Sequence, residues 1–114
     1  MESEEDRDAM HFGAFKDNKL AAVVSVFQKD DDFQFRKLAV DTSMQQMGIG
    51  SGLLDYIIDH AAANGGKRIW CSARCAAIGF YLKKGFNQTG EAFSKSSIEY
   101  EIIEKVLHPH EKRA

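Results

Sequence analysis

Three glycines, Gly48, Gly50 and Gly52, stand at the start of a segment whose apolar spacing predicts a helix. Glycine inside a helix costs about 0.5–1 kcal/mol relative to alanine, so three of them oppose the helix where it is hardest to begin. The first turn of a helix also presents unpaired N–H groups and a partial positive charge, and glycine lets a ligand approach them closely. These residues therefore predict a pyrophosphate site at the start of the helix.

Close packing of the helix against a sheet is a simpler explanation for the same glycines. It fits Gly52 better than it fits Gly48 and Gly50. The spacing is not that of a P-loop, because no Gly-Lys-Ser or Gly-Lys-Thr follows. Leu53 stands where the Rossmann dinucleotide-binding motif requires its third glycine. Binding and packing both stay open at this point.

The helix and the strand before it are the elements that must position the glycines. Ile49, Leu53, Ile57 and Ala61 recur every fourth residue and form one apolar stripe, and Asn-Gly-Gly at 64–66 ends the helix. Residues 33–40 read as a strand. Simple alternation along that strand places four side chains on one face: Phe33, Phe35, Lys37 and Ala39.

The remaining segments predict a mixed sheet with helices packed on it. Further strands are expected at 10–15, 20–27, 68–72, 86–93 and 98–106, and a second helix at 75–84 with Ala77, Phe80 and Tyr81 facing inward. Strand 20–27 is apolar nearly throughout, which is typical of burial on both faces. The order β-β-β-α-β-α-β-β predicts an α+β fold (α/β mixed) with antiparallel hairpins and one parallel pair. Residues 1–114 are expected to form a single domain, with an acidic terminus at 1–9 and a tail at 107–114.

Composition excludes several classes of protein. The 114 residues are 44% hydrophobic and 28% charged, which fits one folded domain. A formal net charge of −2 argues against a nucleic-acid partner. No apolar run is long enough for a membrane span and no signal-like start is present, so a cytoplasmic location is expected. Cys71 and Cys75 have no histidine near them in sequence and are interpreted as buried or semi-buried thiols without a metal.

Two segments resemble the motifs of the GNAT acetyltransferases. Residues 45–50, Gln-Gln-Met-Gly-Ile-Gly, match the Q/R-x-x-G-x-G/A motif of that family and follow a strand that ends Leu-Ala-Val at 38–40. Residues 77–86 are similar to the later A-x-x-L/F-Y-x-x-x-G-F segment. Residues 70–74 and 90–93 resemble one bacterial subgroup of uncharacterised members, and the likeness covers roughly residues 10–106.

The resemblance implies an acetyltransferase that uses acetyl-coenzyme A as acyl donor. In the family, the loop and helix start bind the pyrophosphate and the preceding strand pairs with the pantetheine arm. Tyr81 matches the tyrosine that protonates the departing coenzyme A thiolate, a role that an O–H close to the sulfur can fill; the alternative is that Tyr81 only packs. The residues implied in cofactor binding are Leu38, Ala39, Val40, Gln45, Gln46, Met47, Gly48, Ile49, Gly50, Ser51, Arg74, Ala77 and Tyr81.

The chain departs from the family pattern at three points. Arg74 stands where many members have asparagine. The strand at 33–40 has no carboxylate to act as general base, which leaves Glu91 and Glu99 on later strands as candidates. The family's first strand and two helices have no counterpart before His11. We therefore expect exposed apolar surface that a homodimer covers, with contact through the strand at 98–106, which is expected at or near a sheet edge.

The function expected from these residues is transfer of an acetyl group from acetyl-coenzyme A to an unknown small-molecule or peptide amine. Two alternatives stay open. The first is a GNAT-like module that binds coenzyme A without catalysis. The second is an interaction domain, or half of a larger assembly, in which the glycines serve packing alone.

Overall fold

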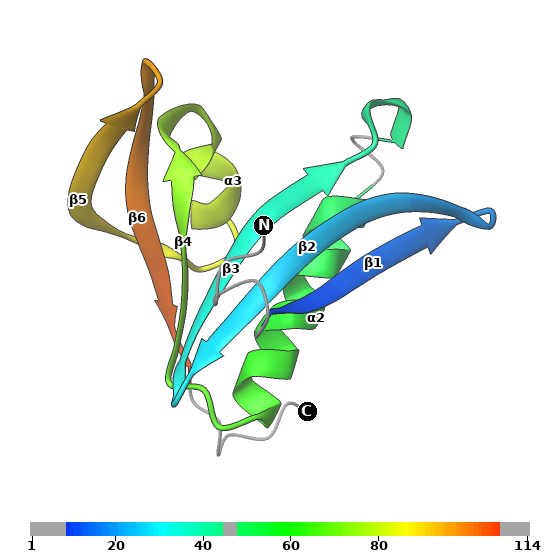
Figure 1. The fold of residues 1–114 in the computed structure, drawn as a ribbon, viewed down its shortest axis with the longest axis horizontal. Helices are drawn as coiled ribbons and strands as arrows, with labels where there is room; N and C mark the ends of the chain where they lie inside the picture. The colour runs from blue at the N-terminus through cyan, green and yellow to red at the C-terminus, as the bar shows by residue number, and fades with distance from the viewer. Residues whose placement is uncertain (1–8, 45–47, 108–114) are drawn as a thin grey trace.

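One mixed sheet of six strands organises the chain in the computed structural model, which describes residues 9–44 and 48–107 (Figure 1). Two helices and two short 3₁₀ turns accompany it. The order along the chain is the one expected from the sequence. The elements are β1 Met10–Lys16, β2 Lys19–Lys29, β3 Asp32–Val40, η1 Thr42–Met44, α2 Ile49–Ala63, β4 Arg68–Arg74, η2 Cys75–Ala77, α3 Ile78–Leu82, β5 Asn87–Lys95 and β6 Ile98–Val106.

The sheet is split between β3 and β4. Its strand order is β1-β2-β3-β4-β6-β5, and every neighbouring pair is antiparallel except β3 with β4. That parallel pair is joined at only three positions, from Asp32 opposite Arg68 to Gln34 opposite Trp70. Beyond Gln34 the two strands diverge and leave a V-shaped opening (Figure 1).

A network of polar side chains holds the closed end of the V. Arg68 on β4 donates to both carboxylate oxygens of Asp32 on β3, at 2.8 and 3.0 Å, and to Glu104 on β6 at 2.9 Å. The indole N–H of Trp70 donates to Asp32 as well, at 3.2 Å. The two carboxylates raise the pKa of the Arg68 guanidinium, chiefly through the hydrogen bond to Asp32. The contact ties together three strands at the point from which the V opens.

The hydrophobic core lies between α2 and one face of the sheet. Leu54, Ile57 and Ala61 of α2 are fully buried against Phe33 and Ile69 of the strands. The predicted apolar stripe is therefore the face that packs. The middle of strand β2, from Ala21 to Val26, is buried on both faces as expected, except that Val23 is 39% exposed; Leu20, before this stretch, is 50% exposed.

A β-bulge overturns the simple alternation expected for β3. Ser25 pairs with Arg36, whereas Val23 pairs with Ala39, so β3 has one extra residue opposite Val24. Lys37 in this bulge has a φ of 60°. The extra residue reverses the parity of the strand, so Leu38 and Val40, not Lys37 and Ala39, join Phe33 and Phe35 against the core.

Strand 98–106, expected at or near a sheet edge, lies near one but is not itself an edge: β6 lies between β4 and β5, and the edge strands are β1 and β5. The inward orientation expected for Phe80 was wrong. The segment at 75–84 is a 3₁₀ turn followed by the short helix α3, in which Ile78 is buried and Phe80 is 39% exposed. Among the described residues, no helix combines the length and the apolar character that a membrane crossing needs.

Candidate active site

The start of α2 presents a first turn without a side-chain cap. Its N-cap is Gly48, with a left-handed φ of 76°, and the first turn contains no acidic residue. The N–H groups of Ile49, Gly50 and Ser51 have no partner within the helix, since they precede the first full turn. Gln45, Gln46 and Met47 lie outside the described residues.

The glycines turn out to have different roles from those the spacing indicated. A Cβ on Gly50 would lie 2.8 Å from Cγ2 of Val40, so this residue allows α2 to approach β3 closely. A Cβ on Gly52 would meet nothing within 4 Å, which makes the packing explanation wrong for that residue. Gly48 also has open space, and its left-handed backbone is the reason for glycine there.

Two hollows meet inside the V. The first, of about 460 Å³, lies between β3, the start of α2 and α3. The second, of about 730 Å³, lies between the diverging β3 and β4. Leu38 and Tyr81 line both, so the two hollows adjoin at these side chains. The first is lined by Leu38, Val40, Met44, Gly48, Ile49, Gly50, Ser51, Phe80 and Tyr81; the second by Phe35, Arg36, Lys37, Leu38, Cys71, Ser72, Ala73, Arg74, Ala77, Tyr81 and Tyr100.

Tyr81 stands at the junction of the two hollows. Its ring packs against Phe35, Phe80 and Phe86 with centroids 5.9, 5.1 and 5.8 Å away. Within residues 9–44 and 48–107 its hydroxyl makes no hydrogen bond, so the O–H is available to a ligand. Burial, and secondarily the nearby Cys71, raises the pKa of the Tyr81 hydroxyl. The group is therefore protonated at neutral pH, the state that a proton donor requires.

The two cysteines differ in their surroundings. Cys71 is buried on β4 and lines the second hollow, and burial raises the pKa of its thiol to about 12. A thiol with that pKa is not ionised at neutral pH and is a poor nucleophile. Cys75 is exposed, contrary to the expectation that both thiols are buried or semi-buried.

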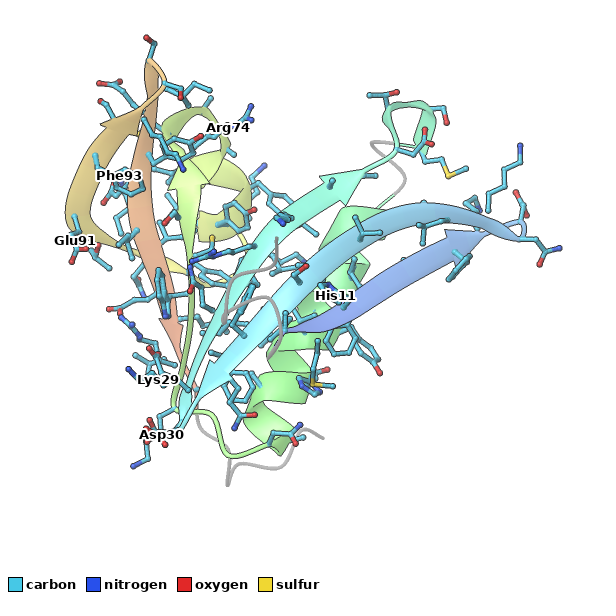
Figure 2. All side chains as sticks on the ribbon, in the orientation of Figure 1. His11, Lys29, Asp30, Arg74, Glu91 and Phe93 are labelled. Atoms are coloured by element: carbon cyan, nitrogen blue, oxygen red, sulfur yellow. The ribbon has the colours of Figure 1, made fainter. Side chains whose placement is uncertain are left out.

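Neither candidate for the general base lines the two hollows. Glu91 is exposed on the edge strand β5, on the side away from the V (Figure 2). Glu99 on β6 is exposed and pairs with Ser94. The buried acidic residue of the described chain is Glu101, which the sequence analysis did not single out. It accepts hydrogen bonds from the side chain of Gln88 at 3.0 Å and the N–H of Gly90 at 2.9 Å, so it holds the irregular part of β5.

Most residues implied by the family motifs come together in the V. Leu38, Val40, Gly48 and Ser51 line the first hollow, and Ala77 lines the second. Ala39 lies on the opposite face of β3, in a shallow depression beside β2. Arg74 is exposed at the open end of β4 and lines only the second hollow (Figure 2). No group of three or more metal-ligating side chains occurs among the described residues.

Known proteins share both the sequence pattern and the fold. The sequence profile of the acetyltransferase (GNAT) family matches residues 1–86. An uncharacterised N-acetyltransferase of Bacillus subtilis strain 168, YitI, is 26% identical over 83% of this chain and 68% of its own length. The ribosomal protein bS18-alanine N-acetyltransferase of Escherichia coli K12 is 30% identical over 69% of this chain, which spans only 55% of that protein.

Solved structures show the same architecture. The crystal structure of the S18-alanine N-acetyltransferase from E. coli superposes with a TM-score of 0.77 at 24% identity, over 93% of this chain and 72% of that one. An aminoglycoside 6'-N-acetyltransferase complexed with coenzyme A gives 0.79 at 15% identity, over 92% of this chain and 76% of that one. At these identities, the comparison with solved structures establishes the fold.

Proposed function

Because the chain belongs to the GNAT acetyltransferase family, we propose that it transfers an acetyl group from acetyl-coenzyme A to a primary amine. The observation that carries this proposal is the junction of two hollows at Tyr81 in the V between β3 and β4. A transferase must hold two substrates whose reacting atoms meet. Two hollows that adjoin at one protonated hydroxyl suit that requirement.

The first hollow suits the cofactor. We assign the pyrophosphate to the first-turn N–H groups of α2, at Ile49, Gly50 and Ser51. The pantetheine arm would follow the open edge of β3 at 38–40, where no β4 partner occupies the backbone groups. That course brings the thioester to Tyr81 and Ala77. Arg74 lies outside this hollow, and its role is taken up below.

The reaction balances with Tyr81 as the proton donor. The amine nitrogen attacks the thioester carbonyl carbon, a C–N bond forms, and the C–S bond breaks. The Tyr81 O–H donates a proton to the departing coenzyme A thiolate. The proton that leaves the nitrogen returns to the Tyr81 oxygen through water. The products are an N-acetylated amine and free coenzyme A.

A non-catalytic coenzyme A binder is the second candidate, and one observation favours it. None of the described residues that line the two hollows is a carboxylate, so none offers a base of that kind for the acceptor ammonium. The acceptor would then have to lose its proton to solvent. The two candidates share the cofactor site and differ in turnover alone.

A paired binding and turnover measurement tests the proposal. Acetyl-coenzyme A binds the folded state, so about 100 times its Kd should stabilise the protein by about 2.7 kcal/mol in thermal unfolding. Incubation with a panel of small-molecule and peptide amines should then release free thiol in proportion to acetylated product. Stabilisation without thiol release from any amine would favour the binding module. An unchanged melting temperature would reject the cofactor assignment itself.

We also propose that the protein is a cytoplasmic homodimer, with the interface moved from β6 to the edge strand β1. Beside β1 the surface carries Phe15, 70% exposed, Leu20, 50% exposed, and Tyr56 of α2, 60% exposed. Exposed apolar side chains along an unpaired edge favour pairing between copies. Light scattering should give twice the chain mass at micromolar concentration, and Phe15→Lys should shift it to a single chain mass. A monomer in the unmodified protein would exclude the dimer.

A further inference from the structure

The hollow between β3 and β4 is basic although the chain is not. Arg36, Lys37 and Arg74 line it, together with no carboxylate from the described residues. The whole chain has 17 acidic and 15 basic residues, so this excess of positive charge is local. A cleft lined by one sign of charge attracts ligands of the opposite sign.

Lys37 and Arg74 are not neutralised by neighbours in the described part of the chain. The basic residues Lys67, Arg68 and Lys84 all pair with carboxylates there, whereas neither Lys37 nor Arg74 makes an ion pair or a side-chain hydrogen bond. Arg36 differs from these two, because its guanidinium lies 5.1 Å from the ring centroid of Phe27 and has other interactions. The inference below therefore depends on Lys37 and Arg74.

These two cations border the opening from different strands. Lys37 is the extra residue of the β3 bulge, so it does not join the core-facing row of that strand. Arg74 ends β4, on the other side of the V, where Figure 2 shows it at the open end. One cation thus stands on each wall of the hollow.

An aromatic surface adjoins Arg74. Arg74 pairs with Tyr100 of β6, and Tyr100 pairs with Phe93 of β5, so the three side chains form a row across one face. The rings of Phe93 and Tyr100 are stacked, with centroids 5.2 Å apart and planes 14° apart. Tyr100 lines the hollow and offers an apolar wall beside the cation.

We propose that the acceptor is a primary amine that also carries an anionic group, a carboxylate or a phosphate, bound by Lys37 and Arg74. This rests on the proposed function, in which the cofactor occupies the first hollow, its thioester reaches Tyr81 and Ala77, and the part of the second hollow beside Lys37 and Arg74 is left to the acceptor. The apolar part of the acceptor packs against Tyr100, and its amine reaches the thioester at Tyr81. A cationic amine of the same size is disfavoured by the same two charges.

Four ring compounds that share an aminomethyl group separate the charge of the para substituent from size. They are para-(aminomethyl)benzoate, the corresponding phenylphosphonate, the corresponding benzamide with an uncharged para group, and para-xylylenediamine, whose para group is a second ammonium. Their binding to protein saturated with coenzyme A is measured by calorimetry, which needs no turnover. We expect the better of the two anionic compounds to bind at least about tenfold more tightly than the benzamide, and the diamine most weakly. Comparing the affinities of the benzoate and the phosphonate distinguishes a site for a carboxylate from a site for a phosphate. The preference should decrease as salt is added, because both cations are exposed.

The double variant Lys37→Gln, Arg74→Gln should abolish the anion preference, an effect larger than any change in its affinity for the benzamide or for acetyl-coenzyme A. The matched control is the double variant Lys16→Gln, Lys95→Gln, which removes the same amount of positive charge outside both hollows. It should keep the preference for the anionic compounds. Equal or weaker binding of both anionic compounds relative to the benzamide would overturn the inference. So would an equally large loss of acetyl-coenzyme A affinity in the Lys37→Gln, Arg74→Gln variant, because the cations would then serve the cofactor phosphates. Absence of acetyl-coenzyme A binding in the unmodified protein would instead reject the proposed function.

Discussion

Tyr81→Phe should lower the turnover number by about 10²–10⁴-fold, the usual contribution of a positioned proton donor. The substitution removes the hydroxyl alone and keeps the ring in its cluster with Phe35, Phe80 and Phe86. Because that hydroxyl makes no hydrogen bond within the described residues, its loss leaves no partner unsatisfied. The measurement is steady-state thiol release with the best amine from the panel, beside acetyl-coenzyme A affinity by calorimetry.

The matched control for this variant is Tyr56→Phe. Tyr56 is 60% exposed on α2 and lines neither hollow of the V, so the same loss of one hydroxyl should leave turnover within about twofold. Affinity for acetyl-coenzyme A should be unchanged in both variants. If Tyr81→Phe turns over as fast as the unmodified protein, Tyr81 is a packing residue and the proton reaches the thiolate by another route.

Ser51→Asp should weaken acetyl-coenzyme A binding by at least tenfold, about 1.4 kcal/mol, without loss of stability. Ser51 lies in the first turn of α2 and lines the first hollow. A carboxylate there repels the pyrophosphate, since two unit charges about 4 Å apart near a protein surface interact by about 4 kcal/mol before salt screening. The same carboxylate interacts favourably with the positive end of the helix, by about 0.3–1 kcal/mol. Affinity and stability should therefore change in opposite directions.

Ser51→Asn isolates charge from size, because asparagine has nearly the shape of aspartate and no charge. We expect it to retain acetyl-coenzyme A binding within about threefold. Gly50→Val would be a poorer probe, since its side chain would collide with Val40 and disturb the packing of α2 on β3. Normal affinity in Ser51→Asp would show that the pyrophosphate lies away from the start of α2.

Local patterns determined the order of the elements and the identity of the family. Ile49, Leu53, Ile57 and Ala61 recur at helical spacing, and α2 is observed with that face toward the core. The residue types and spacing of segment 45–50 are those that the start of a helix requires. Those of segment 77–86 are typical of a short helix that follows a strand. These features depend on residues close in sequence, for which backbone geometry and side-chain polarity are sufficient.

Tertiary structure alone decided how those elements make a site. The bulge at Lys37, the divergence of β3 from β4 after Gln34, and the interior position of β6 all depend on pairing between residues far apart in the chain. A bulge adds one residue to a strand and reverses the face of every residue after it. The alternation of residue types within 33–40 does not show where such a bulge lies. The close contact of Gly50 with Val40 is likewise set by how α2 lies on the sheet. Motif spacing selected Tyr81, but its place at the junction of two hollows follows from the splayed sheet.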